Sequence, residues 1–461
     1  MNNALLWDTG LIKKYDLAGP RYTSYPTAVQ FSETFDRHQY ETSAWQSSAS
    51  RRPLSLYLHI PFCSHVCYYC GCNKIVTKHK GQADSYLNYL FREIEMQAEQ
   101  FSSNQPVEQL HLGGGTPTFL SPDQISALME KLGQHFQLSN DYDNDYSIEL
   151  DPREVDWLMM GRLRDLNFNR ISIGVQDLDE KVQRAVNRVQ SEEQIQSVVD
   201  AARTMAFKSI HMDLIYGLPH QTTDSFMNTV DRVIAMAPDR LSLFNYAHLP
   251  HRFKPQRRIQ QSDLPSPAEK LQILQQATEK LIEQGYVYIG MDHFALPDDE
   301  LAVAQQTGNL HRNFQGYTTH SHCDLVAMGV SSISKVGSVY AQNHVGMEQY
   351  QAAIDADTLP FYRGLVMNRD DEIRQAVINE LICHFRLEPA NIEQQFDIDF
   401  TDYFRNELLA LTPMVRDELI SVSDAAIEVL PGGRLLIRNI CMQFDHYLQQ
   451  QPEQPLFSKV I

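Results

Sequence analysis

The sequence predicts an α/β fold: a partial or complete TIM-type β/α barrel with an N-terminal arm and a mostly helical C-terminal accessory domain. Short β-rich runs alternate with amphipathic helical patterns from Leu54 onward, in the order strand, helix, strand. Such units give parallel strands joined by right-handed crossovers. Polar and glycine-rich residues follow the strands at their carboxyl ends, where barrels build active sites. A doubly wound sheet is the alternative that this alternation leaves open.

The first 50 residues show little regular periodicity. Their segment Arg21-Tyr-Thr-Ser-Tyr-Pro is too aromatic for a disordered tail. We expect an ordered arm, which either covers the surface of the domain or crosses the mouth of the active site and offers Arg21 to a substrate. We predict the second arrangement, with an arm at 1–50, a barrel with its extension at 51–368 and an accessory domain at 369–461.

Seven β-rich runs are predicted strands, at residues 54–60, 109–112, 146–150, 170–175, 210–215, 240–246 and 286–291. Four amphipathic stripes predict helices, within residues 87–98, 125–132, 195–206 and 271–281. Ser121-Pro-Asp supplies the cap and first turn of the second helix. After residue 369 a helical section precedes two short apolar runs that flank a turn. This order of elements is similar to that of a winged helix. Because no basic stripe marks it, we expect a structural role.

Composition narrows the class of protein. The chain has 461 residues, with 39 Lys and Arg against 58 Asp and Glu, so its net charge is −19. This excess argues against nucleic acid or an anionic membrane surface as a partner. The N-terminus lacks the pattern of a secretory signal, and no apolar run approaches the roughly 18 residues of a membrane span. Clustered cysteines without an export signal fit a reducing compartment. We expect a cytoplasmic protein that is a monomer.

Four of the seven cysteines lie between residues 63 and 72, directly after the first predicted strand. Thiolates crowded this closely select zinc, Cu(I) or an iron–sulfur cluster. Structural zinc usually takes two separated Cys pairs. Cys63, Cys67 and Cys70 instead form one Cys-x3-Cys-x2-Cys loop, which can hold three irons of a cubane and leave the fourth open. We favour the iron–sulfur interpretation, and zinc remains the alternative. A disulfide framework is the poorest interpretation, because the other cysteines are scattered and the total is odd.

At these residues the chain resembles the radical S-adenosylmethionine (SAM) superfamily, whose signature is this cysteine spacing. Within it, the chain is similar to the oxygen-independent coproporphyrinogen III oxidases of the heme pathway. Two features carry this narrower similarity. The first is the additional Cys72, in Cys70-Gly-Cys-Asn-Lys, and the second is the N-terminal segment Gly19-Pro-Arg-Tyr-Thr-Ser-Tyr-Pro-Thr27. The resemblance covers nearly the whole chain. Radical-SAM-derived heme chaperones share the cysteine loop but typically lack both features, so they are the second interpretation.

The resemblance implies a [4Fe-4S] cluster on Cys63, Cys67 and Cys70, with the amino and carboxylate groups of SAM on the fourth iron. It also implies two SAM molecules in each chain. The positions that match the cluster-bound SAM are Tyr57, Gly114, Glu149 and Ile333. The positions that match the second SAM are Tyr69, Gly115, Thr116, Gln176, Arg188, Asp213 and Ala247. Cys72 is expected to act near the second SAM or in turnover rather than as a ligand. Phe314 and Gln315 match further active-site positions.

Two of these motifs also have a physical rationale. Gly113-Gly-Gly-Thr-Pro117 follows the second predicted strand, and the absence of side chains allows close approach of its backbone to a ligand. Glu149, at the end of the third strand, can accept two hydrogen bonds from ribose hydroxyls. The alternative for Glu149 is a helix cap or a partner for an arginine. Gln176, Asp213 and Asn245 end the next three strands, which makes a polar rim.

The implied substrate is coproporphyrinogen III, which carries four propionates. The implied reaction abstracts hydrogen from the β-carbon of a propionate, then releases CO2 and one electron to leave a vinyl group. It occurs twice and gives protoporphyrinogen IX. An electron donor such as a flavodoxin or ferredoxin system is implied as a partner. Propionates favour bidentate arginine, and the candidates are Arg21, Arg252, Arg257, Arg258 and Arg312. The abstraction needs no general base, so we expect the histidines to support other residues.

Overall fold

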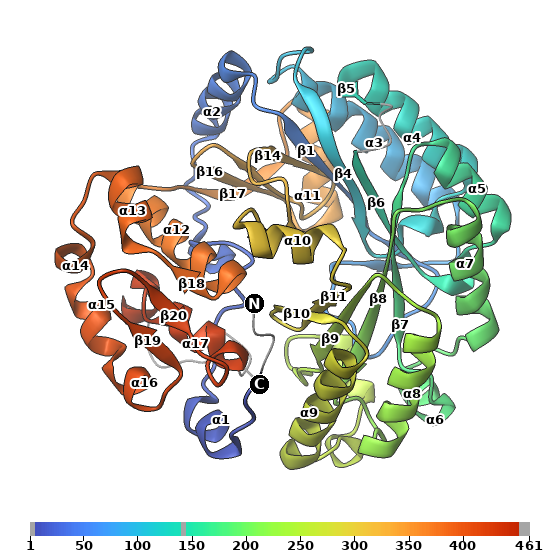
Figure 1. Ribbon diagram of the computed structural model, residues 1–461. Helices are drawn as coiled ribbons and strands as arrows, with labels where there is room; N and C mark the ends of the chain where they lie inside the picture. The colour runs from blue at the N-terminus through green and yellow to red at the C-terminus, as the bar shows by residue number, and fades with distance from the viewer. Residues whose placement is uncertain (1–4, 140–143, 451–461) are drawn as a thin grey trace. The chain divides into compact units, whose positions relative to one another are not determined.

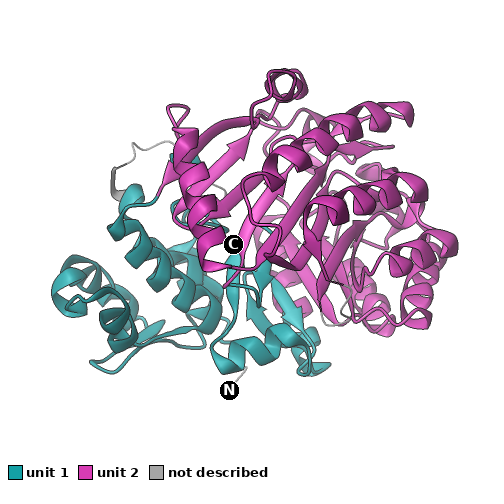
Figure 2. Cartoon of the chain, turned by 90° about the horizontal axis from the view of Figure 1, so that it is seen from above, with its two compact units in different colours: residues 1–30, 278–321, 367–461 teal, residues 31–277, 322–366 magenta. Residues whose placement is uncertain are grey.

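The computed structural model describes residues 5–139 and 144–450 of the chain (Figure 1). They form two units, coloured separately in Figure 2. One unit comprises 1–30, 278–321 and 367–461, and the other comprises 31–277 and 322–366. The predicted segments 1–50, 51–368 and 369–461 stay a prediction, since the two units divide the chain differently.

Six parallel strands form the framework of the larger unit. Their order in the sheet is β9-β8-β7-β6-β4-β1, so neighbours in space are neighbours in the chain. In the register, Leu56 lies opposite Leu110, and Ile148 lies opposite Ile171. The strands are β1 (Leu54–Ile60), β4 (Pro106–Gly114), β6 (Asp145–Leu150), β7 (Arg170–Gln176), β8 (Ser209–Tyr216) and β9 (Arg240–Asn245). The first six predicted strands are therefore confirmed; the first has the predicted bounds, the next four are longer by one to five residues, and the sixth ends one residue early.

Beyond β1 the sheet becomes mixed. The next strand, β14 (Asp324–Met328), pairs in parallel with β1. It is followed in space by β15 (Ile333–Val336), β16 (Val339–Asn343) and β17 (Phe361–Val366), which are antiparallel. Two residues at Gln137–Leu138 form β5 beside β4. The sheet of this unit is an open path of strands, so the architecture is a partial barrel with an antiparallel extension.

Helices connect the parallel strands and lie along their outer side (Figure 1). They are α3 (Gly81–Ala98), α4 (Pro122–His135), α5 (Trp157–Asp165), α6 (Glu180–Ala185), α7 (Glu192–Thr204) and α8 (Thr223–Ala235). The predicted start of α4 is confirmed, because Ser121 and Gln124 form a capping box. The third predicted stripe extends too far: α7 ends at Thr204, and Ala206 has a φ of 56°. A residue in the left-handed region cannot continue an α-helix.

Further helices of this unit are α2 (Arg37–Ser50) and α11 (Met347–Asp355), and α9 (Pro267–Glu283) runs across the boundary at residue 277. The short parallel strands β2 (Phe62–Cys63) and β3 (Ile75–Val76) bracket the cysteine loop. The 3-10 turns of this unit lie at Pro117–Phe119, Pro152–Glu154, Lys254–Arg258 and Gln261–Asp263, and a further one, at Ala28–Gln30, belongs to the smaller unit.

The two faces of the parallel sheet differ in character. Alternate side chains of one face are apolar and fully buried, as Leu54, Leu56, Leu58 and Ile60 are in β1. The residues between them point to the opposite face of the sheet, and many of these are polar: Ser55, Tyr57, His59, Gln109, His111, Ser147, Glu149, Ser172, His211, Asp213 and Ser242. The apolar face holds the helices, and the polar face is available for chemistry.

The smaller unit consists mainly of helices and also contains short antiparallel strands. Its helices are α1 (Thr9–Tyr15), α10 (Glu300–Thr307), α12 (Arg369–His384), α13 (Pro389–Phe396), α14 (Phe400–Tyr403), α15 (Arg405–Ala410), α16 (Thr412–Arg416) and α17 (Ile437–Met442), with 3-10 turns at Arg434–Leu436 and His446–Gln450. Its strands are β10 (Val287–Gly290), β11 (His293–Ala295), β12 (His311–Asn313), β13 (Gly316–Thr318), β18 (Arg386–Leu387), β19 (Ile420–Val422) and β20 (Ile427–Val429). The predicted turn between two apolar runs is confirmed by the β19–β20 hairpin.

The seventh predicted strand, at 286–291, has a different context from the first six. It forms β10, which pairs with β11 in an antiparallel hairpin. Met291 and Asp292, between the two strands, have φ values of 46° and 73°. Two successive residues in the left-handed region turn the chain back at once, so no crossover helix follows.

Residues 20–25 of the arm contact the C-terminal part of their own unit. The hydroxyl of Tyr22 donates to Asp445 at 2.9 Å, and Nε of Arg438 donates to the carbonyl of Pro20 at 2.9 Å. The side chain of Gln375 donates to the carbonyl of Tyr25. The expectation of an ordered arm is confirmed by these contacts.

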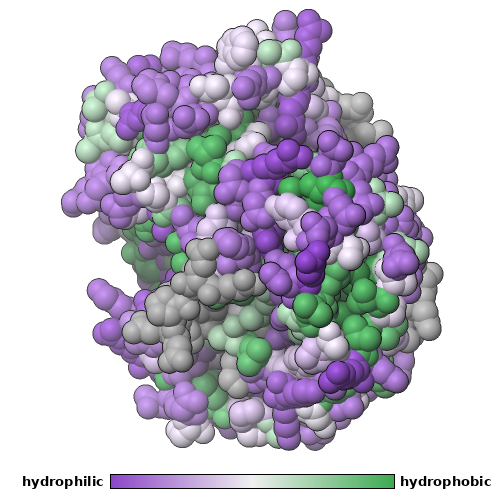
Figure 3. Space-filling model, turned by 90° about the vertical axis from the view of Figure 1, so that its left-hand side faces the viewer, coloured by the Kyte–Doolittle hydropathy of each residue, from purple (hydrophilic) through white to green (hydrophobic). Residues whose placement is uncertain are grey.

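The helices of the described residues include none that is both long and apolar enough to cross a lipid bilayer. Figure 3 shows one face of the molecule, where apolar residues form small patches separated by hydrophilic ones.

Candidate active site

Four cysteines gather around one cavity in the larger unit. Cys63, Cys67, Cys70 and Cys72 all line a cavity of about 240 Å³. Cys63 and Cys67 are buried, Cys70 is half-buried and Cys72 is exposed. The loop is held by its own backbone, since the amide of Cys70 donates to the carbonyl of Cys67 and the amide of Thr77 donates to that of Cys63. All four thiols of this short segment therefore meet at one cavity.

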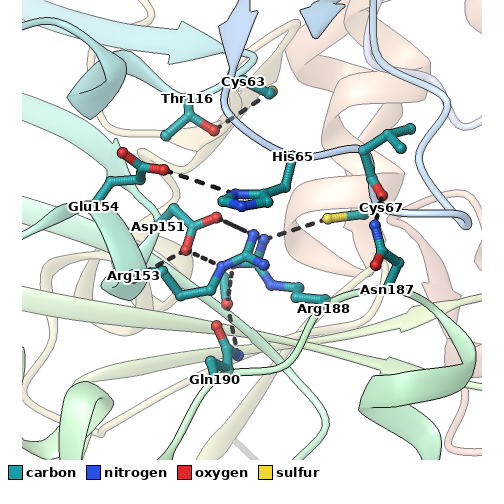
Figure 4. A network of polar contacts seen from close by, with 12 residues as sticks. Cys63, His65, Cys67, Thr116, Asp151, Arg153, Glu154, Asn187, Arg188 and Gln190 are labelled. Carbon is teal, nitrogen blue, oxygen red and sulfur yellow. Dashed lines mark hydrogen bonds and ion pairs between the residues drawn. The ribbon is translucent and has the colours of Figure 1, made fainter. Parts of the chain in front are cut away.

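Neighbouring side chains donate to these sulfurs. The hydroxyl of Thr116 lies 3.5 Å from Sγ of Cys63, and Nη1 of Arg188 lies 3.7 Å from Sγ of Cys67 (Figure 4). A hydrogen bond from Cys72 lowers the pKa of Cys70 to about 5. Donors directed at thiolates stabilise their charge and tune a bound cluster. The three cysteines fit a cluster held by three thiolates with one open position.

Arg188 is the centre of the polar network in Figure 4. Its guanidinium pairs with Asp151 at 3.0 Å and donates to the carbonyl of Gly174 at 2.6 Å. Arg153 also pairs with Asp151, at 2.6 Å. Burial alone would raise the pKa of Asp151, but the hydrogen bonds and charge of Arg153 and the charge of Arg188 hold that pKa at about 2. The network fixes two cations beside the cysteine loop.

Two buried polar atoms at this cavity lack a hydrogen-bond partner. They are Nε of Arg188 and Oε1 of Gln176, at the end of β7. Buried donors and acceptors are normally satisfied. An unsatisfied donor and acceptor beside one cavity fit a polar ligand that supplies both kinds of group.

Close contacts within the protein require the glycine run at the end of β4. A Cβ on Gly113 would lie 2.8 Å from Oε1 of Glu149, and one on Gly114 would lie 2.6 Å from the ring of His59. A Cβ on Gly115 would lie 2.7 Å from the carbonyl oxygen of Phe62. Gly114 also has a φ of 114°. The glycines are thus required by close packing of β4 against β1 and β6, in addition to any approach of a ligand.

Glu149 projects from the end of β6 and is held from two sides. Its carboxylate accepts from the amide of Gly114 at 3.1 Å and lies 3.3 Å from Nε2 of His111. Burial opposes its ionisation, but the hydrogen bond and charge of His111 and the amide of Gly114 lower the pKa of Glu149. Glu149 is not a helix cap and has no arginine partner among the residues that the structure describes, so the alternative interpretation of this residue lacks support.

Asp213, near the end of β8, also has a histidine neighbour. Nε2 of His211 lies 3.4 Å from its carboxylate, and the hydroxyl of Ser172 donates to it at 3.1 Å. Burial raises the pKa of Asp213, and the charge of His211 opposes the rise. Both His111 and His211 therefore contact a carboxylate of the polar face, which agrees with the expected supporting role.

The cavity brings together most of the residues expected from the sequence. Besides the four cysteines, its lining includes Tyr69, Gly114, Gly115, Thr116, Glu149, Gln176, Arg188 and Asp213. Tyr57, Ala247 and Ile333 belong to the same unit but not to this lining. Tyr57 stacks on His111, with ring centroids 5.8 Å apart. It thus contacts the residue that contacts Glu149.

Sequence reasoning missed several lining residues, among them Ser172 and the pair Asp151 and Arg153. Asp151 also caps the 3-10 turn at Pro152–Glu154, and a cap is the ordinary role of Asp before Pro. The available signal was its position two residues after Glu149, on the same side of the strand end.

The remaining expected residues lie in the smaller unit. Phe314 and Gln315 form the turn between β12 and β13, and the guanidinium of Arg312 stacks on Tyr317 at 4.7 Å. Three buried donor atoms here lack a partner: Nε and Nη1 of Arg312 and Nε2 of Gln315. These donors are available to a ligand that accepts hydrogen bonds.

Positive charge accumulates around these donors. Burial raises the pKa of Asp292, and the charges of Arg21, Arg438 and Arg312 oppose the rise. Burial and then the like charge of Arg21 lower the pKa of Arg438 to about 10. Three arginines around one carboxyl leave an excess of positive charge, which favours an anion.

The three other arginines expected to bind propionates lie in the larger unit. Arg252, Arg257 and Arg258 are exposed residues of the larger unit, and none of them lines the cavity of the cysteines.

Comparison with known proteins agrees with the geometry. The sequence model of the radical SAM superfamily matches residues 57–233. The chain is 56% identical over its full length to the full-length oxygen-independent coproporphyrinogen III oxidase of Pseudomonas aeruginosa. It is 52% identical to the enzyme of that name from Escherichia coli, over 99% of this chain and 98% of the relative.

A solved structure from the same family also matches the chain. The structure of coproporphyrinogen III oxidase from Escherichia coli, described as a radical SAM enzyme, matches with a TM-score of 0.92 and 51% identity. The match covers 96% of this chain and 100% of that one. Full-length identity above half, together with the cysteine loop and its cavity, leads to one conclusion: the chain belongs to the oxygen-independent coproporphyrinogen III oxidase family of the radical SAM superfamily.

Proposed function

We propose that this chain catalyses the anaerobic oxidative decarboxylation of two propionates of coproporphyrinogen III to vinyl groups, which gives protoporphyrinogen IX. The observation that carries the proposal is the cavity where Cys63, Cys67 and Cys70 meet Glu149 and the glycine run, in a chain of this family. A [4Fe-4S] cluster with SAM supplies the 5′-deoxyadenosyl radical that abstracts a hydrogen atom from the β-carbon. Loss of CO2 and transfer of one electron from the substrate radical to a separate one-electron acceptor would then leave the vinyl group.

The three cysteines of the loop hold the cluster, while Thr116 and Arg188 donate to two of their sulfurs. Ionised Glu149 accepts hydrogen bonds from the ribose hydroxyls of the first SAM. The amides of Gly114, Gly115 and Thr116 are already bonded within the protein, so this run recognises its ligand through carbonyl oxygens, which suit an ammonium group. Tyr57 and Ile333 complete this SAM site.

A second SAM lies against Tyr69, Gly115, Thr116, Gln176, Arg188, Asp213 and Ala247. The unsatisfied atoms of Gln176 and Arg188 support this assignment, since SAM carries both donors and acceptors. Cys72 lines the same cavity without being needed as a fourth ligand. We assign it to turnover, close to this second molecule.

The propionates are bound by arginines of the smaller unit. Arg312 and Arg21 share an excess of positive charge around Asp292, and Arg312 and Gln315 hold donors without partners. Carboxylates fit such donors in geometry and charge. Phe314, in the same turn as Gln315, offers an apolar contact for the tetrapyrrole. We further propose a monomer of the cytoplasm that receives electrons from a flavodoxin or ferredoxin system.

The test is an anaerobic assay of the reconstituted protein with coproporphyrinogen III, SAM and a strong reductant. Tetrapyrrole products and 5′-deoxyadenosine are measured in the same samples. Formation of vinyl product together with deoxyadenosine is expected. Deoxyadenosine without vinyl product would discard the substrate and keep the radical chemistry. If an intact cluster gave neither product but the protein bound heme stoichiometrically, the heme-chaperone interpretation would replace this one.

A further inference from the structure

The cysteine loop lies in a part of the chain that is depleted of negative charge. The protein has 58 acidic residues among 461, yet none occurs between Glu41 and Asp84, the stretch that contains the loop. A second stretch without acidic residues runs from Asp239 to Asp263 and contains Arg252, Lys254, Arg257 and Arg258. The chain as a whole has a net charge of −19, so these two stretches differ in charge from the rest of the sequence.

The second stretch packs directly on the cysteine loop. The ring of Phe253 lies so close to Gly71 that a Cβ on Gly71 would be 3.0 Å from it. The side chain of Gln256 donates to the carbonyl of Tyr69 at 2.9 Å. Nη1 of Arg258 lies 3.1 Å from the hydroxyl of Tyr68, and the guanidinium stacks on that ring. The segment from residue 251 to 258, termed here the 251–258 surface, therefore covers the loop between Cys67 and Cys72.

A small apolar cluster fixes this contact. Tyr68 and Tyr69 of the loop pack against the buried residues Val182, Val186, Leu218, Tyr246 and Ile259. Since Tyr246 and Ile259 flank the 251–258 surface on either side, both ends of the segment are anchored beside the loop. The cations are consequently held near the cluster position by packing.

The charged ends of this surface are open to solvent. Arg252, Lys254, Arg257 and Arg258 are exposed, and none of the four forms an ion pair with any residue that the structure describes. Along the sequence, the acidic residue nearest to this segment is Asp263, in a 3-10 turn. Glu180, on α6, is already paired with Arg184. Four cations without an ion-pair partner among the described residues, on one short segment, favour a positive local potential.

Two anionic partners could use such a surface: the propionates of the substrate or an acidic protein. The residues from 251 to 258 do not line the cavity of the cysteines, and Phe253 and Gln256 face the loop from outside. An outward row of long cations suits the acidic patch of a macromolecule and steers its approach. The observations favour the protein.

We propose that the 251–258 surface is the docking site of an acidic one-electron donor protein that reduces the cluster. This inference rests on the proposed function, since it needs a cluster on Cys63, Cys67 and Cys70. In the step, the donor is oxidised by one electron and the cluster is reduced by one electron, with no bond formed or broken. Docking here brings the donor against the loop that carries the thiolates.

The test compares two reductants on the reconstituted holoenzyme without tetrapyrrole. Stopped-flow absorbance follows cluster reduction by a reduced acidic [2Fe-2S] ferredoxin or by dithionite. The variant is Arg252→Glu with Lys254→Glu, and the matched control is Arg37→Glu with Arg51→Glu, two exposed cations at the first residue and at the C-cap of α2. Electrostatic steering changes association rates by roughly 10- to 1,000-fold.

We expect the second-order rate constant with ferredoxin to fall about tenfold or more at low salt in the variant, and the difference to shrink as salt screens the charges. Reduction by dithionite, and both rates in the control, should stay unchanged. Equal ferredoxin rates in variant and wild type would overturn the proposal. So would an equal loss with dithionite, which would indicate a disturbed loop; the neutral pair Arg252→Gln with Lys254→Gln repeats the comparison with less perturbation.

The propionate alternative has its own signature. In that case the variant would raise the KM for coproporphyrinogen III in the dithionite-driven assay, and this result with unchanged ferredoxin rates would reassign the surface to substrate. Because cluster reduction is measured without tetrapyrrole, a wrong substrate assignment leaves the docking result interpretable.

Discussion

Nε2 of His111 lies 3.3 Å from Oε1 of Glu149, on adjacent strands of the polar face. The other ring nitrogen of His111 is 2.7 Å from the hydroxyl of Ser147. The imidazole is thus fixed between a hydroxyl and the carboxylate proposed to bind ribose. His111 does not line the cavity, so it acts through Glu149 as a positioning residue.

Replacement of His111 by Phe should therefore weaken SAM binding while the cluster stays intact. Phe keeps the stacking on Tyr57 but removes the hydrogen bond to Glu149. A hydrogen bond to a charged group contributes about 1.5–3 kcal/mol, so the Kd for SAM should rise roughly tenfold or more. Equilibrium binding with reconstituted protein measures it. His111→Gln, which retains a donor, should recover part of the affinity; an unchanged Kd in the Phe variant would remove His111 from this role.

Substitution of Cys72 should separate cluster assembly from turnover. Cys72 is exposed beside the cavity, whereas Cys63 and Cys67 are buried and receive hydrogen bonds from Thr116 and Arg188. Cys72→Ser should keep the cluster absorbance and lose formation of the vinyl product. Cys63→Ser, as the comparison, should lose the cluster and all SAM cleavage. Iron and sulfide analysis decides the matter, because loss of iron in the Cys72 variant would make that residue a ligand.

Much of the framework was predictable because strands with one buried apolar face show a period-two alternation of apolar residues, as 54–60 does. The misplaced features depend on single backbone angles. Ala206, which lies two residues beyond the end of α7, adopts positive φ without being glycine, and so do Met291 and Asp292 in the turn from β10 to β11. Non-glycine residues seldom adopt that conformation, so no local sequence pattern predicts these turns.

The site divides in a similar way. Cys63, Cys67 and Cys70 were predictable from spacing, and Glu149 from its place at a strand end. The ion pairs of Asp151 with Arg153 and Arg188 were not, because Asp before Pro is an ordinary turn signal and Arg188 is distant in the chain. Arg188 lies in the connection between α6 and α7, and periodicity alone does not show that this connection folds back onto Asp151.

Removal of the Arg188 guanidinium should lower the reduction potential of the cluster. Arg188 donates to Sγ of Cys67 and carries a positive charge beside it. A cation stabilises the reduced cluster, which is more negative by one charge, so its loss favours the oxidised state. In Arg188→Gln the midpoint potential should fall by on the order of 59 mV, a tenfold change for one electron. Redox titration followed by electron paramagnetic resonance measures it; an equal or higher potential would contradict the assignment.

Glu93 should make folding stability depend on pH. Burial raises the pKa of this carboxyl to about 7, although Tyr350, Gly329 and Asn343 donate to it. A carboxyl whose folded pKa exceeds its unfolded value binds its proton in the native state while the unfolded chain has lost it. Its stabilising contribution is therefore complete at low pH and is lost as pH rises from the unfolded value through about 7.

Glu93→Gln removes this titration but leaves an amide among donors, which should cost about 1–3 kcal/mol. The difference in unfolding free energy, wild type minus variant, should decrease between pH 5 and pH 7. Urea unfolding of both proteins at several pH values measures the difference. A difference that stays constant over this interval would show that Glu93 does not titrate there.

Replacement of Arg312 by Lys should weaken binding of the tetrapyrrole and leave SAM cleavage intact. Nε and Nη1 of Arg312 are buried donors without partners, in a cluster where Arg21 and Arg438 add positive charge around Asp292. Lysine keeps the charge but cannot offer two parallel donors to a carboxylate. The KM for coproporphyrinogen III should rise roughly tenfold, the effect of one lost charged hydrogen bond. Lys13→Gln, an exposed cation on α1 of the same unit, should leave KM unchanged. A normal KM in the Arg312 variant would move the propionate site elsewhere, because the unsatisfied donors would then have no part in substrate binding.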